Sequence, residues 1–417
     1  MTPSRPLSEQ QCRVLQEHLP AYHVKSLTGA DDVDKWTDKH LWNAFLTGVH
    51  VVVGTPAVLA DALTHAFVSI SDLSLCIFDE AHRCTKGHPM NKIMRDFYHP
   101  TKLRGDAVPH VLGLSASPVL NSNGLAAIES NLDAVTVTPK RFREELETHT
   151  HPPELTKVDY DENAPALRQD SICYKLYQEV TCYDLGNDPY VLELLDQDDH
   201  QAKLRLLKVY KKGKTNTSEQ LHTLMTRAGH ISTQLGNSMA EWYIRTCLRR
   251  YLEVRQSSSS LIDDLESRER HHLEAIVRRL LAASDTTGET RMDVASTSDK
   301  ARELHDVLLR NTKTGLRSIV FVEQRAMVVA LAHMLRTPAL SQLYNIGTFV
   351  GNSGHPSRKI LLSDLVDLRT QDQDLQAFRD GEKNLMIATN VLEEGIDIPA
   401  CNGVICFDLP KNLISFV

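Results

Sequence analysis

Two adjacent carboxylic acids at the end of an apolar run are the strongest chemical signal in the sequence. Asp79 and Glu80 open an Asp-Glu-Ala-His tetrapeptide that ends at His82 and directly follows the apolar residues 75–78. Unpaired buried carboxylates are costly unless a metal ion or hydrogen bonds compensate. A Mg²⁺–nucleotide complex would compensate, with the first acid holding the ion through water and the second deprotonating the attacking water. The alternative is an ordinary acidic helix start, which the helix dipole also favours.

A second polar motif follows the next apolar run. Ser115 and Ser117 come directly after residues 111–114. Because the carboxyl ends of parallel strands meet at one edge of a sheet, these hydroxyls can hydrogen-bond to the acids and to His82. A Ser-Ala-Ser tripeptide is by itself a common turn. Behind the acidic motif it indicates a nucleotide site.

Strand-like runs at both ends of the chain are separated by a helical segment. The runs are short and nearly all apolar, which is typical of buried parallel strands. From residue 221 to residue 242, apolar side chains instead recur at steps of three and four, the period of a helix. We therefore expect an α/β fold with two parallel-sheet domains, residues 1–150 and 297–417, and an all-helical insertion at 151–296. The runs are residues 51–53, 75–78, 111–114, 319–322, 385–388 and 404–407.

The composition is that of an intracellular globular protein. Its 417 residues, 41% hydrophobic and 24% charged, exceed one ordinary domain. The sequence has no apolar run of about 18 residues and no apolar stretch near its start, so we expect neither a membrane span nor a secretion signal. Its eight cysteines lack paired spacing, which indicates reduced thiols and no zinc site. We expect a cytoplasmic location in preference to a nuclear one.

The net charge of −8 argues against a surface that coats nucleic acid over its whole area. Nucleic acid held in a cleft stays compatible with this charge. One segment, residues 203–214, is rich in lysine and arginine and contains no acid. The ordinary interpretation is a solvated surface. The alternative is contact between RNA phosphates and Lys208, Lys211 and Lys212.

The acidic and serine motifs, together with other segments, resemble those of the superfamily 2 helicases. In that family two RecA-like domains hold ATP between them, so the resemblance implies two RecA-like domains and the cofactors ATP and Mg²⁺. The acidic tetrapeptide corresponds to the second family motif and Ser115–Ser117 to the third. The other segments that carry the resemblance are Pro3 with Leu7, Gln10 and Gln11, then Gly54-Thr55-Pro56 with Leu59, then Ile319–Arg325, Gln376–Gly381 and Ala388–Pro399.

The resemblance also implies roles for single residues. Gly54 and Thr55 would contact RNA, and Thr389 would contact the RNA backbone. Asp397 and Gly395 would reach the nucleotide or couple it to RNA. Hydroxyls and N–H groups at strand ends and helix starts suit such phosphate contacts.

The Dicers and the RIG-I-like RNA sensors have an all-helical insertion between two such domains. The sequences of the motifs resemble those of the fungal Dicer-like proteins most. The resemblance implies a module that translocates on double-stranded RNA. The full-length protein that contains it would cut this RNA into small interfering RNAs for RNA silencing and antiviral defence. Silencing-complex proteins are the implied partners, and the oligomeric state stays open. The alternatives are a RIG-I-like or Hef-like helicase, or a non-catalytic RNA-binding scaffold.

Two parts of the family pattern are missing from the sequence. No GxxxxGK[ST] phosphate loop precedes Asp79, and the chain ends before an arginine-rich sixth motif. Gly213-Lys214-Thr215 is not such a loop, because Lys208 stands where a glycine is needed and the segment is helical in pattern. We therefore expect a helicase module cut off at both ends, with little or no ATPase activity by itself.

Overall fold

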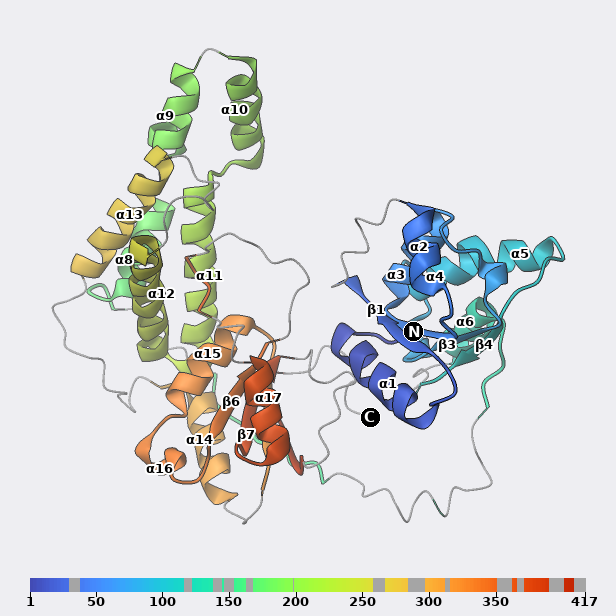
Figure 1. Ribbon diagram of the computed structural model, residues 1–417. Helices are drawn as coiled ribbons and strands as arrows, with labels where there is room; N and C mark the ends of the chain where they lie inside the picture. Colours follow the sequence, from blue (N-terminus) through green and yellow to red (C-terminus); the bar gives the residue numbers. More distant parts are fainter. Residues whose placement is uncertain are drawn as a thin grey trace. The chain divides into compact units, whose positions relative to one another are not determined.

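The computed structural model divides the chain into two compact units, and each is described by itself (Figure 1). The first unit lies mainly within Met1–Leu155, and the second within Thr156–Val391 and Ile398–Asp408. The structure describes residues 1–29, 38–115, 122–137, 145, 154–162, 168–197, 199–257, 267–283, 297–311, 316–350, 362–365, 371–389 and 401–408.

The first unit is built on two pairs of short parallel strands. β1 (Val24–Leu27) pairs with β2 (Val51–Gly54), and β3 (Leu75–Phe78) pairs with β4 (His110–Gly113). The flanking helices are α1 (Arg5–His18), α2 (Lys39–Leu46), α3 (Pro56–Thr64), α4 (Pro89–Ile93), α5 (His99–Leu103) and α6 (Ser122–Leu132), with the short turns η3 (Ile70–Asp72), η4 (Ala81–Arg83) and η5 (Met94–Tyr98).

The first two residues join the two strand pairs. The amino group of Met1 donates to the carbonyl oxygen of Ile77 at 2.8 Å, and the N–H of Asp79 donates to the Met1 carbonyl at 2.9 Å. On the other side, the N–H of Thr2 donates to the carbonyl oxygen of Gly54 at 3.0 Å. The backbone of Met1 and Thr2 therefore lies between β2 and β3. The residues that follow β2, β3 and β4 consequently emerge at one edge of a shared hydrogen-bonded array.

One face of β3 and β4 is buried and the other is exposed. Phe78 is completely buried in the core of the first unit. On the opposite face Leu75, Ile77 and Leu112 are 53%, 40% and 46% exposed. The apolar run at 75–78 therefore does not form a strand that is covered on both faces. In the described part of the chain, only one face of β3 packs against helices.

The second unit contains a four-stranded parallel sheet in the order β6-β7-β5-β8. Both central strands are buried at every residue. Ser298 caps the helix α14, because its Oγ accepts the N–H of Ala301 at 3.1 Å. The strands are β5 (Ser318–Val322), β6 (Ile346–Phe349), β7 (Leu385–Thr389) and β8 (Gly403–Cys406), and the helices beside them are α14 (Asp299–Arg310), α15 (Arg325–Met334), α16 (Pro338–Ser341) and α17 (Gln371–Asp380).

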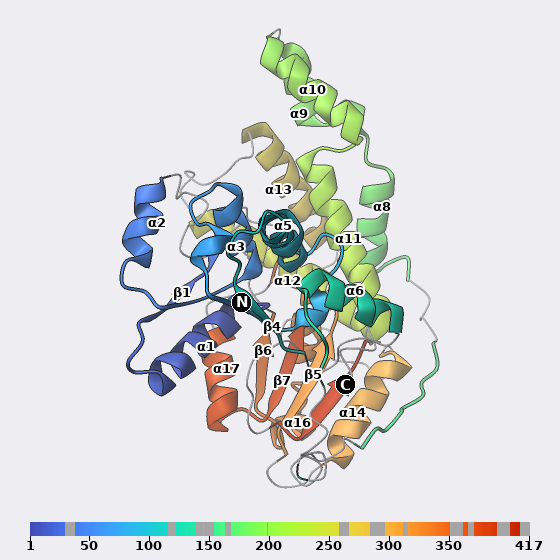
Figure 2. The same cartoon turned by 90° about the vertical axis from the view of Figure 1, so that its right-hand side faces the viewer.

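The helical segment belongs to the same unit as this sheet. The periodic run from residue 221 to 242 is divided between two helices at Gly236, whose φ of 105° interrupts helical geometry. The hairpin of α9 and α10 projects from the end of the bundle that lies away from the sheet (Figures 1 and 2). The elements are α8 (Ile172–Thr181), η6 (Leu185–Asn187), α9 (Pro189–Asp196), α10 (His200–Lys212), α11 (Asn216–Leu235), α12 (Asn237–Ser257) and α13 (Ser267–Ala282).

A single hydrophobic core continues from these helices into the sheet. Leu224 of α11, Tyr243 of α12 and Val320 of β5 are all completely buried members of it. At the junction, the rings of Trp242 on α12 and His333 on α15 stack with centroids 3.8 Å apart and an interplanar angle of 8°. The helical segment therefore packs directly on the second sheet.

The fold class expected from the sequence, two parallel α/β regions with an all-helical segment between them, is confirmed. The domain limits at residues 150 and 296 stay predictions. Within the described residues, no helix is long and apolar enough to cross a membrane.

The close packing behind β4 gives a first testable prediction. A methyl group on Gly113 would lie 2.8 Å from the Cβ of Ala81 and 3.1 Å from the Cδ1 of Leu132. Gly113→Ala is therefore expected to lower the free energy of unfolding by about 1–3 kcal/mol through overpacking, measured by urea titration. Gly87→Ala is the control, because a methyl group there meets no atom within 4 Å in the described structure. Equal unfolding midpoints for the two variants would contradict the prediction.

Candidate nucleotide site

The two acids lie at a sharp turn directly after β3. Asp79 directly follows the strand, and its Oδ1 accepts the N–H of Glu80 at 3.0 Å. Glu80 has φ 52° and ψ 46°, in the left-handed region, which costs a side-chain-bearing residue about 1–2 kcal/mol. Backbone strain of this kind concentrates at functional sites. The next residue is held in place because the N–H of Ala81 donates to the carbonyl of Leu114 at 2.8 Å.

His82 connects the acidic motif with the serine motif. Its Nδ1 lies 3.0 Å from the Oγ of Ser115 and 3.2 Å from the Oε2 of Glu80. The histidine side chain is 17% exposed and the glutamate side chain 31% exposed, so the group is partly shielded but open to a ligand. The structure thus brings together three of the residues that the sequence assigned to the nucleotide site, from the ends of two neighbouring strands.

Burial holds the pKa of the His82 imidazole below its ordinary value. The Glu80 carboxylate opposes this shift, and Arg83 adds to it. The lowered pKa favours a neutral ring at neutral pH. A neutral imidazole with a hydrogen on Nδ1 donates toward Glu80 and Ser115, whereas the other tautomer accepts from the serine hydroxyl.

The half-buried carboxylate of Asp79 suits a Mg²⁺ ion that keeps most of its waters. Among the described residues, no group of three or more His, Cys, Asp or Glu side chains is arranged to hold a metal. Mg²⁺ commonly binds through one or two carboxylates together with phosphate oxygens and water, so Asp79 can serve as a protein ligand to it.

Other predicted site residues are described only in part. Ser117, Gly395 and Asp397 lie outside the described residues. Thr389 ends β7 and is 5% exposed, and its Oγ1 has no hydrogen-bond partner among the described residues. Buried hydroxyls usually have a hydrogen-bond partner, and residues 390–400, which follow Thr389, lie outside the described residues.

Gly54 and Thr55 lie at the end of β2. A methyl group on Gly54 would lie 2.4 Å from the carbonyl oxygen of Leu27, so only glycine fits beside β1. Thr55 is the N-cap of α3, and its hydroxyl makes no capping hydrogen bond within the described chain. The first residue of α3, Pro56, has no N–H, and the N–H of Val58 donates to the carbonyl of Thr55 at 3.2 Å. The hydroxyl of Thr55 is therefore the group at this helix start that suits a phosphate contact.

The predicted basic segment forms the outer helix of the α9–α10 hairpin. Lys208, Lys211 and Lys212 are exposed on α10, whereas Lys214 pairs with Glu219 at 2.7 Å. The same helix also exposes apolar side chains, which the charge pattern did not reveal. These are Leu204, Leu207 and Tyr210, which are 47%, 64% and 59% exposed.

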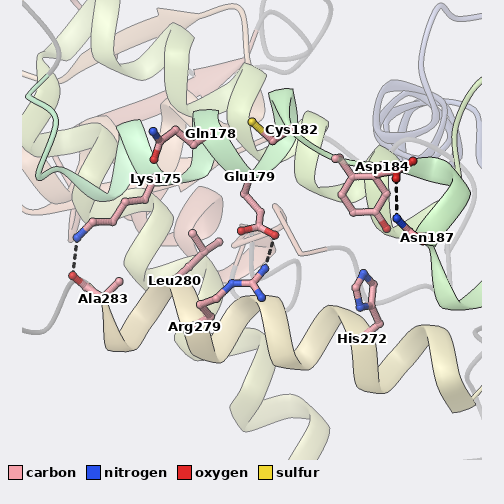
Figure 3. A pocket seen from close by; sticks show the side chains of 11 residues that line it. Lys175, Gln178, Glu179, Cys182, Asp184, Asn187, His272, Arg279, Leu280 and Ala283 are labelled. Atoms are coloured by element: carbon pink, nitrogen blue, oxygen red, sulfur yellow. Dashed lines mark hydrogen bonds and ion pairs between the residues drawn. The ribbon is translucent and has the colours of Figure 1, made fainter.

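A pocket of about 600 Å³ lies elsewhere, between α8 and α13 (Figure 3). An ion pair between Glu179 and Arg279 crosses it, and the Nζ of Lys175 donates to the carbonyl of Ala283 at 2.5 Å. Its cationic groups are therefore engaged within the protein. This pocket contains none of the residues that the sequence assigned to nucleotide or RNA.

The lowered pKa of His82 gives a second prediction. The folded protein binds this proton less readily than the unfolded chain, so the free energy of unfolding is highest above about pH 6.5 and falls as the pH drops. His82→Gln is expected to make this fall shallower, measured by denaturant titration between about pH 7 and pH 5. The exposed His40, changed to Gln, is the control. Curves for wild type and His82→Gln that stay parallel would contradict the prediction.

Comparison with known proteins finds two domain families. The family model described as DEAD/DEAH box helicase matches residues 1–125, and the helicase conserved C-terminal domain matches residues 299–417. Over the full chain, Dicer-like protein 2 of Phaeosphaeria nodorum is 39% identical, that of Aspergillus fumigatus 40%, and Dicer-like protein 2-1 of Aspergillus niger 41%. The chain spans 30% of the length of each of these relatives. A solved structure, the Hef helicase domain of Pyrococcus furiosus, is 19% identical, with a TM-score of 0.44 over 98% of this chain and 80% of that one.

Proposed function

The chain belongs to the DEAD/DEAH-box helicases, as the helicase module of the fungal Dicer-like proteins, and on this premise we propose that it uses ATP to move on double-stranded RNA. The observation that carries the proposal is the contact of His82 with both Glu80 and Ser115. This contact links the residue proposed to act on water with the end of the neighbouring strand.

Each residue of the candidate nucleotide site is proposed to have its own role in phosphoryl transfer. Mg²⁺ bound with ATP would supply positive charge against the phosphates. Asp79 would hold that ion. Glu80 orients the attacking water and accepts its proton, a role that its position in the left-handed turn supports by directing the side chain toward His82. His82 and Ser115 hold Glu80 in place, and Ser117, Gly395 and Asp397 are proposed to complete the nucleotide site.

RNA is proposed to contact the edge residues and the hairpin. Thr55 offers its hydroxyl at the start of α3, and Gly54 directly precedes it at the end of β2. The unmet hydroxyl of Thr389 offers another donor at the end of β7. Lys208 and its neighbours on α10 add charge that attracts any phosphate backbone. Such contacts carry no sequence information, which suits the recognition of double-stranded RNA by shape.

In its full-length parent, the module is proposed to deliver double-stranded RNA for cleavage into small interfering RNAs, in RNA silencing and antiviral defence. The names of the relatives support this assignment. Partners from a silencing complex, and a cytoplasmic location, are part of the same proposal.

Replacing Glu80 by glutamine tests the catalytic assignment. Glu80→Gln, made in the full-length protein, keeps the size and hydrogen bonding of the side chain but removes the proton acceptor. RNA-stimulated ATP hydrolysis is expected to fall by about 10²-fold or more, while ATP and RNA affinities stay close to wild type. Glu17→Gln, at an exposed position of α1, is the control. Turnover within about threefold of wild type would mean that Glu80 is not the base.

A non-catalytic scaffold predicts a different result in the same assay. Such a protein would bind RNA, but its full-length wild type would hydrolyse no ATP above background. Strong turnover that depends on Glu80 excludes the scaffold. RNA binding without turnover, in the wild type, favours it.

The salt dependence of RNA binding tests the role of α10. Replacing Lys208, Lys211 and Lys212 by glutamine is expected to reduce the slope of log affinity against log salt by about 0.7–0.9 for each phosphate that the helix no longer neutralises. Lys214 is left unchanged because Glu219 already neutralises it. Lys157→Gln, at an exposed lysine paired with Asp159, is the control. An unchanged slope in the triple variant would leave α10 as an ordinary solvated surface.

A further inference from the structure

A short segment of the second α/β region is buried against helices of the insertion. It comprises Leu362–Leu365, which lies between β6 and α17 in the sequence. Leu362 and Ser363 are 1% and 3% exposed. The N–H of Leu362 donates to the Oε1 of Gln220 on α11 at 3.0 Å. A loop residue of the sheet region is thus a hydrogen-bonded part of the helical bundle.

The carbonyl oxygen of Ser363 accepts two further hydrogen bonds from that bundle. The Nη1 of Arg227 on α11 donates to it at 2.7 Å, and the hydroxyl of Tyr243 on α12 donates at 2.6 Å. Tyr243 is completely buried, and burial raises the pKa of its hydroxyl far above the ordinary value. The hydroxyl of Tyr243 therefore stays protonated and remains a donor to Ser363.

These contacts join the helices that follow the basic hairpin in sequence to the sheet region. Gly213 ends α10 in the left-handed conformation, and the capping box of Thr215 starts α11 directly afterwards. The 20 residues of α11 then extend over about 30 Å to the junction with α14 and α15. On the sheet side, the N–H of Val350 donates to the Oε1 of Gln371 at 3.0 Å, which ties β6 to the start of α17.

We propose that Arg227 and Tyr243 are positioning residues that couple RNA binding on the helical segment to nucleotide turnover. By holding Ser363, they make the sheet region that ends at Thr389 respond when α10 and α11 shift on RNA. The proposal rests on the proposed function, since it requires that RNA stimulate ATP hydrolysis. It differs from a purely structural role because coupling is reciprocal: RNA must raise nucleotide affinity by the same factor as nucleotide raises RNA affinity.

The test compares two buried tyrosine hydroxyls in the full-length protein. Tyr243→Phe removes the hydroxyl that bonds across to Ser363. Tyr344→Phe removes a hydroxyl that donates to the carbonyls of Leu308 and Asn311 at 2.9 and 3.0 Å, within the sheet region itself. Both variants lose a buried hydroxyl bonded to backbone carbonyls, so their effects on stability are matched. Only the first breaks a contact between the helical segment and the sheet region.

The measurements are RNA affinity with and without a non-hydrolysable ATP analogue, the affinity for that analogue with and without RNA, and ATP turnover with and without RNA. Tyr243→Phe is expected to reduce the coupling factor by about fivefold or more, equally in both directions. Turnover without RNA, and RNA affinity without nucleotide, are expected to stay within about twofold of wild type. Tyr344→Phe is expected to keep the wild-type coupling factor. Arg227→Gln, which weakens the second donor on Ser363, is expected to reduce coupling in the same direction.

Amide hydrogen exchange of the unmodified protein supplies a readout that needs no variant. Binding of double-stranded RNA is expected to increase the protection of Leu362–Leu365. Unchanged protection contradicts the proposal.

The remaining outcomes distinguish a failure of the proposed function from a failure of the coupling role of Arg227 and Tyr243. Wild-type protein in which RNA and nucleotide do not affect each other contradicts the proposed function, and the coupling role with it. Wild type that couples, together with Tyr243→Phe and Arg227→Gln variants that couple as strongly, contradicts only the coupling role. A Tyr344→Phe variant that loses coupling as far as Tyr243→Phe also overturns it, because the loss would then follow stability.

Discussion

The parallel pairing of β3 with β4 is the constraint on which the candidate site depends. Phe78 lies opposite Gly113 in this register, so the chain leaves both strands at the same level. The N–H of Leu114 then donates to the carbonyl of Phe78 at 2.8 Å and continues the ladder. A shift of one residue would move every side chain of β3 to the other face. His82 and Ser115 would then no longer meet.

Much of this arrangement follows from local sequence. The apolar runs at 75–78 and 385–388 coincide with β3 and with most of β7. The contact of His82 with Ser115 could be expected because strand ends in a parallel sheet share an edge. These features depend on residues close in sequence or on a rule of topology, and neither needs knowledge of distant packing.

Other features could not be predicted, because they depend on packing between segments far apart in the chain. The hydrogen bond from Tyr243 to Ser363 joins residues 120 positions apart, and no periodicity marks either of them. The sequence predicts an all-helical insertion between two α/β domains, but it does not show what the insertion packs against. The helices and the second sheet lie in one compact unit with a shared core, because the apolar faces of α11 and α12 need α15 to complete their burial.

The stiffness and length of α11 have a mechanical consequence. Its buried apolar side chains extend from Leu221, near the hairpin, to Leu235 at the far end, and all belong to the core that continues into the second sheet. The exposed α9–α10 hairpin directly precedes this helix. A tilt of the hairpin end therefore cannot occur without repacking of the core over the roughly 30 Å length of the helix.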